Sequence, residues 1–277
     1  FDLIASTWSL MAVTGTLPRA RFHHSAVVWS GRMTIFAGQA FNGVTLDLSN
    51  DVHTFNITSA TWDGAMETTG TLPSPRYDHS AVAWIDSAGT YGMTMFGGIG
   101  VLGYLGDVYT LNLITGEWTT VVASSGTPPR ARSGHSAVVW MNSFTGTVQM
   151  TTFGGRTAMG YENDIHTLDI ESFVWNEVNA AGQSLPSARM EHDAVAWIDP
   201  VLHAQKMTIF GGLDNDYKKD TFTATLLTTN HIDIIGSSPS TAPTSRAKFF
   251  SYKSPRLDTL GLAFRVGIDR GWARGSG

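Results

Sequence analysis

The sequence contains no cysteine among its 277 residues. Disulfide bonds, thiolate metal sites and cysteine nucleophiles are therefore excluded. Charged residues are also scarce, at 15% of the chain, and the net charge is -5 with a pI near 6.0. This balance gives no basic surface for nucleic acid or for an anionic membrane. No apolar run approaches the ~18 residues of a membrane helix, so we expect no membrane insertion.

Hydrophobic residues make up 42% of the chain, which is enough for a sizeable core. One pattern occurs four times: a segment such as 76–84 followed by a second such as 93–98. Its histidines are 55, 56 and 57 residues apart by residue number: His24, His79, His135 and His192. A fixed period of this length indicates a propeller or a solenoid, so we expect one cooperative domain.

Each repeat predicts four short strands, a to d. Strand a, such as 24–29, is rich in β-branched and aromatic residues, and strand b, such as 33–36, ends at a pair of small residues. Glycine in that pair permits a tight turn, so strand b is expected to stop there. Strand c alternates polar and apolar residues, as in 51–57, and a tryptophan begins strand d: Trp62, Trp118 and Trp175. A polar stretch ending in Gly-Thr-Leu-Pro is expected to return the chain as a loop.

Several motifs recur in phase over residues 1 to about 230: Arg-x-x-His-Ser-x-Val-x-Trp, a hydrophobic strand ending in Gly-Gly, Asp-Val-x-x-Leu, and the tryptophan of strand d. In these motifs the chain resembles the kelch-repeat family. The resemblance implies an all-β fold, a β-propeller of four-stranded antiparallel blades that most often binds other proteins through its loops. The strand pattern favours the same arrangement, because small antiparallel sheets bury both faces only by stacking on neighbours.

The repeats divide the single domain, 1–277, into 9–62, 63–118, 119–175 and 176–232. Residues 1–8 align without a gap on strands c and d of the first repeat. Residues 233–277 continue the phase as a decayed copy of strands a and b, with Phe249 in place of the histidine. We therefore predict five blades, the last a composite of 233–277 and 1–8 that leaves no exposed edge. The alternative is a fragment of a larger propeller.

Alternating strand directions place the d-to-a and b-to-c connections on one face, here called the loop face. It is predicted to carry four arginines near the axis and three tyrosines, each three residues before an aspartate. These are the predicted partner-binding residues: Arg21, Arg76, Arg132, Arg189, Tyr104, Tyr161 and Tyr217. Aromatic residues and arginine are typical of binding surfaces. In the structural alternative the arginines cap carbonyls and pair with acids of the next blade, and the tyrosines shield loop backbone.

The four repeated histidines are predicted to be structural, each imidazole bonding the backbone of a neighbouring blade. Histidines spaced widely around a ring do not converge on one metal ion. Glu162, Asp164 and His166 share a strand face that could bind a divalent cation, but Asp164 and His166 recur in the first repeat, which favours a structural role. Residues 214–216 lack the glycine and the distal glutamate of an EF-hand loop. We predict no metal site and no cofactor.

Catalytic patterns of the resembled family are also missing. Galactose-oxidase-like propellers need a cysteine-crosslinked tyrosine, and the Glu-x-x-x-Asp-x-x-x-His iron triad of nitrile-specifier-like proteins is not found. We therefore predict a non-catalytic module that binds a protein partner or assembles with itself. Two alternatives stay open: a structural subunit of an extracellular or filamentous assembly, and a small-ligand or metal-dependent enzyme at the channel mouth. The richness in Thr, Ser and Gly leans toward an extracellular or secreted location.

Overall fold

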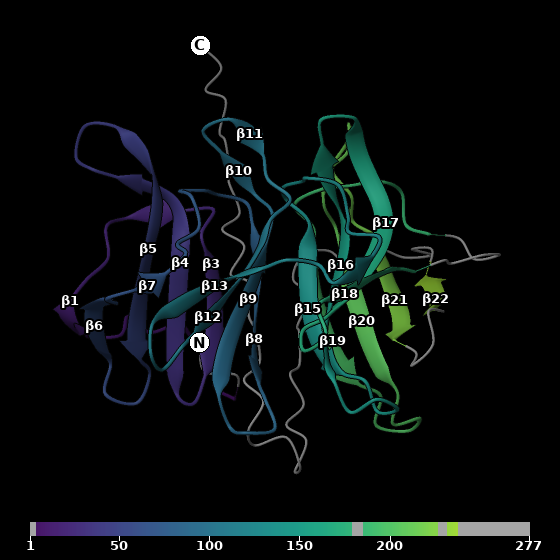
Figure 1. The fold of residues 1–277 in the computed structure, drawn as a ribbon, viewed down its shortest axis with the longest axis horizontal. Helices are drawn as coiled ribbons and strands as arrows, with labels where there is room; N and C mark the ends of the chain where they lie inside the picture. Colours follow the sequence, from purple (N-terminus) through teal and green to yellow (C-terminus); the bar gives the residue numbers. More distant parts are fainter. Residues whose placement is uncertain (1–3, 179–184, 227–231, 238–277) are drawn as a thin grey trace.

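The computed structural model describes residues 4–178, 185–226 and, for the backbone, 232–237. All regular structure in this part of the chain is β (Figure 1). The described residues include no helix that is long and apolar enough to cross a membrane.

The strands form four blades that follow one another in chain order. Blade 1 consists of β3 (Ser25–Trp29), β4 (Arg32–Phe41), β5 (Leu46–Asn56) and β6 (Thr61–Ala65). Blade 2 consists of β8 (Ser80–Ile85), β9 (Tyr91–Phe96), β12 (Val108–Asn112) and β13 (Glu117–Val121). Blade 3 consists of β15 (Ser136–Met141), β16 (Val148–Thr157), β17 (Gly160–Asp169) and β18 (Val174–Glu177). Blade 4 consists of β19 (Asp193–Ile198), β20 (Gln205–Phe210), β21 (Thr221–Leu226) and β22 (Ile232–Ser237).

Strands a to d pair antiparallel with their neighbours within each blade. Neighbouring blades contact each other through their innermost strands, β3 against β8, β8 against β15, and β15 against β19. The predicted all-β propeller of four-stranded antiparallel blades is therefore confirmed, with four blades among the described residues.

Three further strands come from the polar stretches between blades, which the sequence predicts as loops. They are β1 (Thr14–Thr16), β7 (Thr69–Gly70) and β14 (Ser125–Gly126). Each of these strap strands pairs in parallel with strand d of the blade that follows it: β1 with β6, β7 with β13, and β14 with β18. The loop prediction is wrong because glycine lets the segment lie directly on the tryptophan backbone. A Cβ added to Gly70 would lie 2.2 Å from the Trp118 carbonyl oxygen.

The prediction that strand b stops at its small pair is wrong in blades 1 and 3. There β4 and β16 continue through the pair with a shift of register, between Phe36 and Gly38 and between Phe153 and Gly155. Gly38 has a φ of 93°, which the left-handed region permits for glycine, so the pair forms a bulge instead of an end. In blade 2 a separate hairpin of β10 (Ile99–Gly100) and β11 (Gly103–Tyr104) follows β9.

The core lies between blades. Phe36 packs on Trp118 of the next blade with ring centroids 4.9 Å apart, and Phe96 packs on Trp175 at 5.4 Å. In blade 4 the register of strand d departs from the period, because Ile234, and not Ile232, lies opposite Ala224. The corresponding pairs are Leu111 with Trp118 and Leu168 with Trp175. The connection between β21 and β22 is therefore longer than those of the earlier blades.

The predicted composite blade lies outside the described residues except for 4–8 and 233–237. The backbone of 233–237 belongs to β22, the outer strand of blade 4. Residues 4–6 form a turn, Thr7 makes a single bridge, and Trp8 is 84% exposed, whereas Trp118 is 2% exposed. The five-blade closure stays a prediction, and its described end lacks the buried tryptophan that strand d has in blades 2 and 3.

Candidate interaction surface

The b-to-c hairpins of blades 1 to 3 lie at one end of the propeller, the upper end in Figure 1. In every blade the d-to-a segment, which in blade 1 includes β2 (Arg21–Phe22), pairs with the b-to-c connection. This creates four loop-face rows of cross-strand neighbours. From the inner to the outer position they are Phe22, Gln39 and Leu48; Tyr77, Ile99 and Tyr104; Ser133, Arg156 and Tyr161; Met190, Leu213 and Tyr217.

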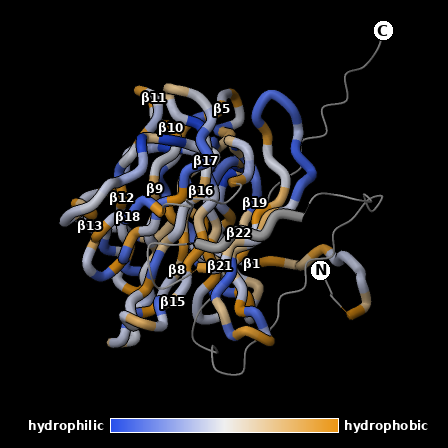
Figure 2. The backbone as a smooth tube through the Cα atoms, turned by 90° about the vertical axis from the view of Figure 1, so that its right-hand side faces the viewer, coloured by the Kyte–Doolittle hydropathy of each residue, from blue (hydrophilic) through white to orange (hydrophobic). Residues whose placement is uncertain are grey.

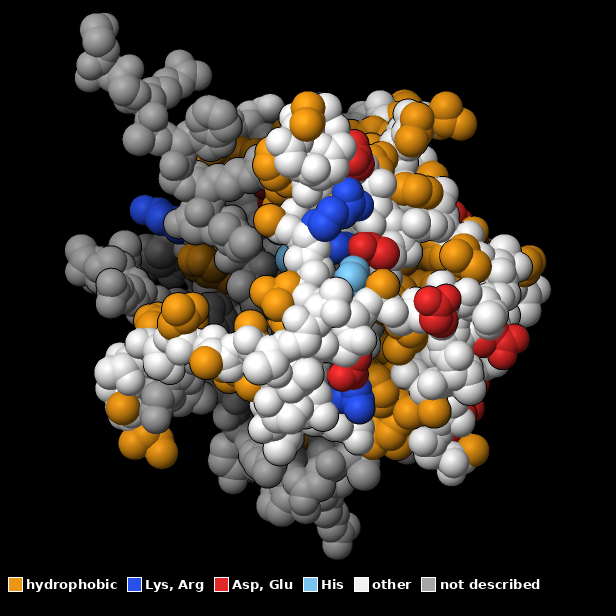
Figure 3. All heavy atoms as spheres, turned by 90° about the vertical axis from the view of Figure 1, so that its left-hand side faces the viewer, with side chains coloured by type: hydrophobic (Ala, Val, Ile, Leu, Met, Phe, Trp, Pro, Cys, Tyr) orange, Lys and Arg blue, Asp and Glu red, His pale blue; other side chains and the backbone are white. Residues whose placement is uncertain are grey.

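The three predicted tyrosines are the outer members of rows 2, 3 and 4, so the structure brings them to equivalent places on one face. Tyr217 is 90% exposed, and Tyr104 and Tyr161 are half-buried. Beside them the hairpin tips expose large apolar side chains: Val44 at 86%, Leu102 at 101% and Met159 at 81%. The tip beside β11 is orange in Figure 2, and hydrophobic side chains gather along the upper edge of Figure 3. The loop face is therefore apolar and aromatic at its periphery.

The four predicted arginines lie beneath this surface. Arg76, Arg132 and Arg189 are 0% exposed, and the side chain of Arg21 is 3% exposed. Each guanidinium binds an aspartate that lies in strand c or immediately before it. Two nitrogens of the guanidinium make the contact, at 2.5–2.9 Å. The pairs are Arg21 with Asp51, Arg76 with Asp107, Arg132 with Asp164, and Arg189 with Asp220. The expected pairing with the next blade is wrong, because each aspartate belongs to the arginine's own blade.

Arg76 uses all five of its N–H groups. Besides Asp107, it donates to the Gly97 carbonyl at 3.0 Å, the Ser74 carbonyl at 3.0 Å and the Ser74 hydroxyl at 3.1 Å. Arg189 repeats this set with Gly211 and Ser187. A buried guanidinium with every donor occupied has nothing left for a partner. These arginines therefore fix the d-to-a segment to strand c and position the loop face.

The ion pairs perturb the carboxylates. Burial alone would raise the pKa of Asp164, but hydrogen bonds from Arg132 and His166 and the Arg132 charge outweigh it and hold the pKa well below 3.8. Asp51 behaves in the same way, with burial opposed by hydrogen bonds from Arg21, Ser49 and His53. The pairs of Arg132 with Asp164 and of Arg21 with Asp51 therefore stabilise the folded state as long as these two aspartates are ionised.

Backbone hydrogen bonds join the loop face across blades. The second residue of each small pair donates to the arginine carbonyl of the next blade at 2.8 Å: Gly38 to Arg76, Gly98 to Arg132, and Gly155 to Arg189. In return the Arg76 backbone N–H donates to the Ser49 carbonyl of the preceding blade at 3.1 Å. The base of the loop face is thus one hydrogen-bonded frame.

Three of the four repeated histidines join blades through a serine hydroxyl of the preceding blade, and the expected bond to backbone stays a prediction. Ser25 Oγ lies 2.7 Å from His79 Nε2, and the same contact joins Ser80 to His135 at 2.7 Å and Ser136 to His192 at 2.8 Å. A serine and a histidine at this distance resemble a nucleophile and its base. All six side chains are buried, however, and the pair recurs at three interfaces. The arrangement is a blade joint and offers no accessible nucleophile.

Blades 1 and 3 differ systematically from blades 2 and 4. Two residues before the buried arginine, the odd blades have Arg19 and Arg130, and the even blades have Ser74 and Ser187. Two residues after the aspartate, the odd blades have a histidine that bonds it at 2.9–3.0 Å: His53 and His166. The even blades have an aromatic ring there that stacks on the guanidinium at 5.5–5.6 Å: Tyr109 and Phe222. The described propeller therefore repeats in pairs of blades.

Four residues immediately before the repeated histidines form what we call the axial collar: His23, Asp78, Gly134 and Glu191. All four have a positive φ of 54–61°. Their peptide groups are linked in sequence across the blades, because Asp78 N–H donates to His23 O at 3.1 Å, Gly134 to Asp78 O at 3.0 Å, and Glu191 to Gly134 O at 2.8 Å. The collar thus lies at the inner edge of the loop face, next to the first members of the rows.

The metal alternative finds little support in the geometry. His166 has one ring nitrogen 3.0 Å from Asp164 and the other 3.1 Å from the Thr127 carbonyl, which leaves neither for a metal ion. Asp164 in turn is held by Arg132. Among the described residues no group of three or more potential ligands is placed to hold a metal ion. In 214–216, Asp214 caps its own turn and pairs with Lys218 at 2.8 Å.

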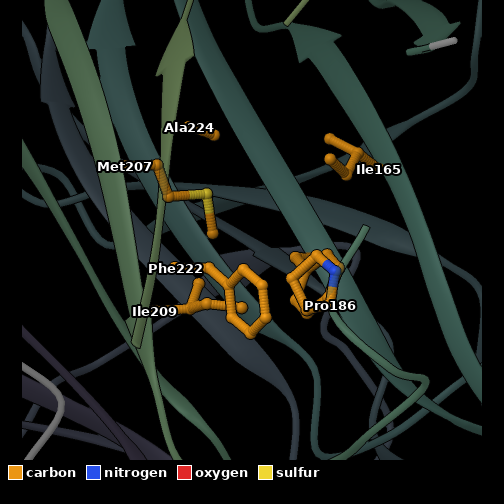
Figure 4. A pocket seen from close by; sticks show the side chains of 7 residues that line it. Ile165, Pro186, Met207, Ile209, Phe222 and Ala224 are labelled. Atoms are coloured by element: carbon orange, nitrogen blue, oxygen red, sulfur yellow. The ribbon is translucent and has the colours of Figure 1, made fainter. Parts of the chain in front are cut away.

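An apolar cavity of about 20 Å³ lies between blades 3 and 4 (Figure 4). It is lined by Phe153, Ile165, Pro186, Met207, Ile209, Phe222 and Ala224. Phe36 and Phe96, the counterparts of Phe153, contact a tryptophan at the earlier interfaces. The cavity has space for about one water and is far below the ~300 Å³ of a small-ligand site.

The model of the KLHDC2/KLHL20/DRC7 Kelch-repeats domain matches residues 1–89 and 48–255 of the chain. The chain belongs to the kelch-repeat family. Kelch domain-containing protein 1 of Mus musculus is 26% identical over 243 residues, which cover 78% of this chain and 55% of that protein. Acyl-CoA-binding domain-containing protein 6 of Oryza sativa subsp. japonica is 30% identical, covering 74% of this chain and 29% of that protein. Host cell factor 2 of Homo sapiens is 27% identical over 76% of this chain and 27% of its own length.

This kelch chain therefore spans between about a quarter and about half of the length of these relatives. Propellers of the family are typically protein-interaction modules. Two features of its surface escaped the sequence analysis: the inner row members and the axial collar. The signal for the collar was present, because the residue before each repeated histidine is the one position of that motif that changes freely in charge and size.

Proposed function

We propose that this kelch propeller is a non-catalytic protein-binding module that holds its partner on the loop face. The observation that carries the proposal is the contrast between the frame and the surface above it. The frame repeats from blade to blade and is buried, whereas the tips differ in every blade and expose apolar side chains. Exposed aromatic and apolar side chains on a rigid base are typical of partner-binding surfaces.

The predicted tyrosines are assigned to partner contact and the predicted arginines to its support. Tyr217 offers a fully accessible ring, and the ring of Tyr161 stacks on Arg156 at 5.4 Å, which presents both groups together. An anchored aromatic ring supplies contact area at a low entropic cost. The arginines enter the interface only indirectly, through the loop positions that they hold.

The test uses linear peptides selected from a displayed random library on the immobilised chain. Replacing Tyr104, Tyr161 and Tyr217 together by alanine should weaken a selected peptide at least about 30-fold, which is about 2 kcal/mol and typical of aromatic anchors. The matched control replaces Phe144 and Leu202, exposed on the a-to-b hairpins of the opposite face, by alanine. Unchanged affinity in the tyrosine variant, with loss in the control variant, would overturn the proposal.

One observation favours the second candidate, a subunit of a larger assembly. The opposite face also exposes large apolar side chains: Phe144, Val201 and Leu202. A protein with apolar patches at both ends of its axis can form lateral or stacked contacts with itself. Sedimentation velocity of the chain alone distinguishes the two, because the assembly model requires association that is reduced by alanine at Phe144 and Leu202.

A further inference from the structure

A cavity of about 330 Å³ lies between blades 1 and 2, at the end of the propeller opposite the loop face. Its volume is that of a small-ligand site, whereas the cavity between blades 3 and 4 holds about one water. Buried residues form its base: Trp29, Thr54 and Leu113. Partly or largely exposed residues form its rim: Arg32, Asp63 and Ile114. The charged rim therefore faces solvent.

A bulge in blade 1 shapes this cavity. The register of β5 with β6 shifts by one residue, so that Asp63 and Gly64 both lie opposite Thr54. Gly64 has a φ of 88°, which glycine adopts without strain. In blades 2 and 3 strand d pairs with strand c without a shift. All three residues of the bulge line the cavity, and a bulge changes the direction of the side chains that it carries.

The Asp63 carboxylate meets the Arg32 guanidinium at the rim. One nitrogen, Nη1, contacts one carboxylate oxygen, Oδ2. The guanidinium also lies 6.0 Å from the centroid of the Trp29 ring, which holds it in place. Within the described part of the chain no further hydrogen bond engages this guanidinium or this carboxylate, in contrast to Arg76, whose N–H groups are all occupied. The pair therefore retains donors on one side and an acceptor on the other.

The charged pair does not belong to the repeat. Its counterparts in blades 2 and 3 are neutral: Gly92 and Gln149 for the arginine, and Thr119 and Asn176 for the aspartate. A feature that serves the stacking of blades is expected to recur from blade to blade. The pair and the bulge are therefore specific to the cavity.

A chain of hydrogen bonds ends at the base of the cavity. Trp29 Nε1–H donates to Thr34 Oγ1 at 2.8 Å, and Thr34 Oγ1 lies 3.1 Å from Thr54 Oγ1. Because the indole nitrogen only donates, the Thr34 hydroxyl accepts from it and keeps its own proton for Thr54. The Thr54 hydroxyl then has a proton to donate to a ligand. The chain recurs in the other blades, and in blade 1 its end meets the cavity.

We propose that this cavity binds a free α-amino acid with an apolar side chain. The carboxylate of the ligand accepts hydrogen bonds from Arg32, and its ammonium group donates to Asp63. The side chain of the ligand lies against Met66 and Leu113, which line the cavity. An α-amino acid carries its two charges on one carbon atom, so they match two rim charges that are in contact with each other. The inference goes beyond the proposed function and does not rest on it, because the site lies at the other end of the propeller.

The probe is L-leucine, titrated into the unchanged chain and followed by isothermal titration calorimetry. Three compounds each lack one of its groups: leucinamide the carboxylate, N-acetyl-leucine the ammonium, and glycine the apolar side chain. Each should bind at least about tenfold more weakly than L-leucine. Equal affinity for the four compounds would overturn the inference, and so would an absence of L-leucine binding at about 10 mM.

Two neutral variants assign the contacts. Asp63→Asn should reduce the preference for L-leucine over N-acetyl-leucine to less than about twofold, and Arg32→Gln should do the same for the preference over leucinamide. The side chains are 45% and 37% exposed, so both variants are expected to fold. The matched controls are Asp47→Asn and Arg19→Gln, which make the same changes in a pair of blade 1 with 44% and 46% exposure and should keep both preferences. Preferences that persist in Asp63→Asn and Arg32→Gln would overturn the inference.

Discussion

The strap strands provide a direct test of how one blade is tied to the next. Gly70 in β7 has a φ of 77°, and an added Cβ would lie 2.2 Å from the Trp118 carbonyl oxygen. Gly89, in the a-to-b hairpin of the same blade, has a φ of 83° with no atom within 4 Å of an added Cβ. The variants Gly70→Ala and Gly89→Ala therefore share the backbone penalty and differ only in the contact with β13.

The expected magnitudes follow from that difference. Alanine in the left-handed region costs about 1–2 kcal/mol, and the reduced entropy of the unfolded chain returns about 0.4–1 kcal/mol, so Gly89→Ala should cost about 1 kcal/mol. Gly70→Ala must also move β7 away from β13. This lengthens the hydrogen bonds from Thr69 N–H to Gly116 O, now 3.0 Å, and from Thr71 N–H to Trp118 O, now 3.1 Å. Each is worth about 1 kcal/mol net, so the total should be about 3 kcal/mol.

Urea unfolding followed by tryptophan fluorescence measures both variants, with the midpoint and the slope recorded separately. Equal losses of unfolding free energy in Gly70→Ala and Gly89→Ala would refute the view that the strap strands join blades. Gly126→Ala supplies an independent repeat of the test, because its added Cβ would lie 1.7 Å from the Trp175 carbonyl oxygen.

Two further predictions concern the ion pairs and the cavity. The pKa of Asp164 is lowered in the folded state, so its contribution to stability is present above the ordinary value of 3.8 and is lost as the pH falls below it. Urea midpoints between pH 6 and pH 2 should therefore depend less steeply on pH in Asp164→Asn than in the unchanged chain, and equal slopes would contradict the assignment. Ala224 lines the cavity between blades 3 and 4 at the place where blades 2 and 3 have Leu111 and Leu168, but the cavity has space for about one water, so Ala224→Leu, which adds three carbon atoms, should lower the unfolding free energy by about 1–3 kcal/mol. Thermal unfolding measures this, and a raised melting temperature would mean that the cavity accepts the whole side chain.

The periodic parts of the fold could be predicted from the sequence. Strands a to d recur with the same residue types, and the tryptophan of strand d recurs in three repeats. The strap strands could not, because Gly-Thr-Leu-Pro has the composition of a turn, and only the tertiary contact with strand d makes it a strand. The bulge at Gly38 was missed for a similar reason, since glycine is compatible with both a bulge and a strand end.

The sequence predicts where the residues of the candidate site lie better than it predicts what each of them does. The tyrosines and arginines were assigned to one face, but their burial was decided by partners elsewhere in the repeat. Each arginine is matched by an aspartate that repeats with it, and this matched pair was the signal for a buried ion pair. The alternation of Arg19 with Ser74 is not part of the single-repeat pattern, because it recurs only in every second blade.

Trp8 tests the composite blade. Blade 1 carries Met33 and Ile35 where blade 2 carries Met93 and Met95, which pack on blade 1, so the side of blade 1 away from blade 2 is expected to receive another blade. If residues 1–8 supplied the outer strands of that blade, Trp8 would be buried as Trp118 is, and its removal would cost about 3–5 kcal/mol. Trp8 is 84% exposed, so we expect Trp8→Ala to cost less than about 1 kcal/mol, against about 3–5 kcal/mol for Trp118→Ala. Comparable losses in the two variants would place Trp8 in a blade core and establish the closure by residues 1–8. A small loss would mean that residues 1–8 do not close the propeller.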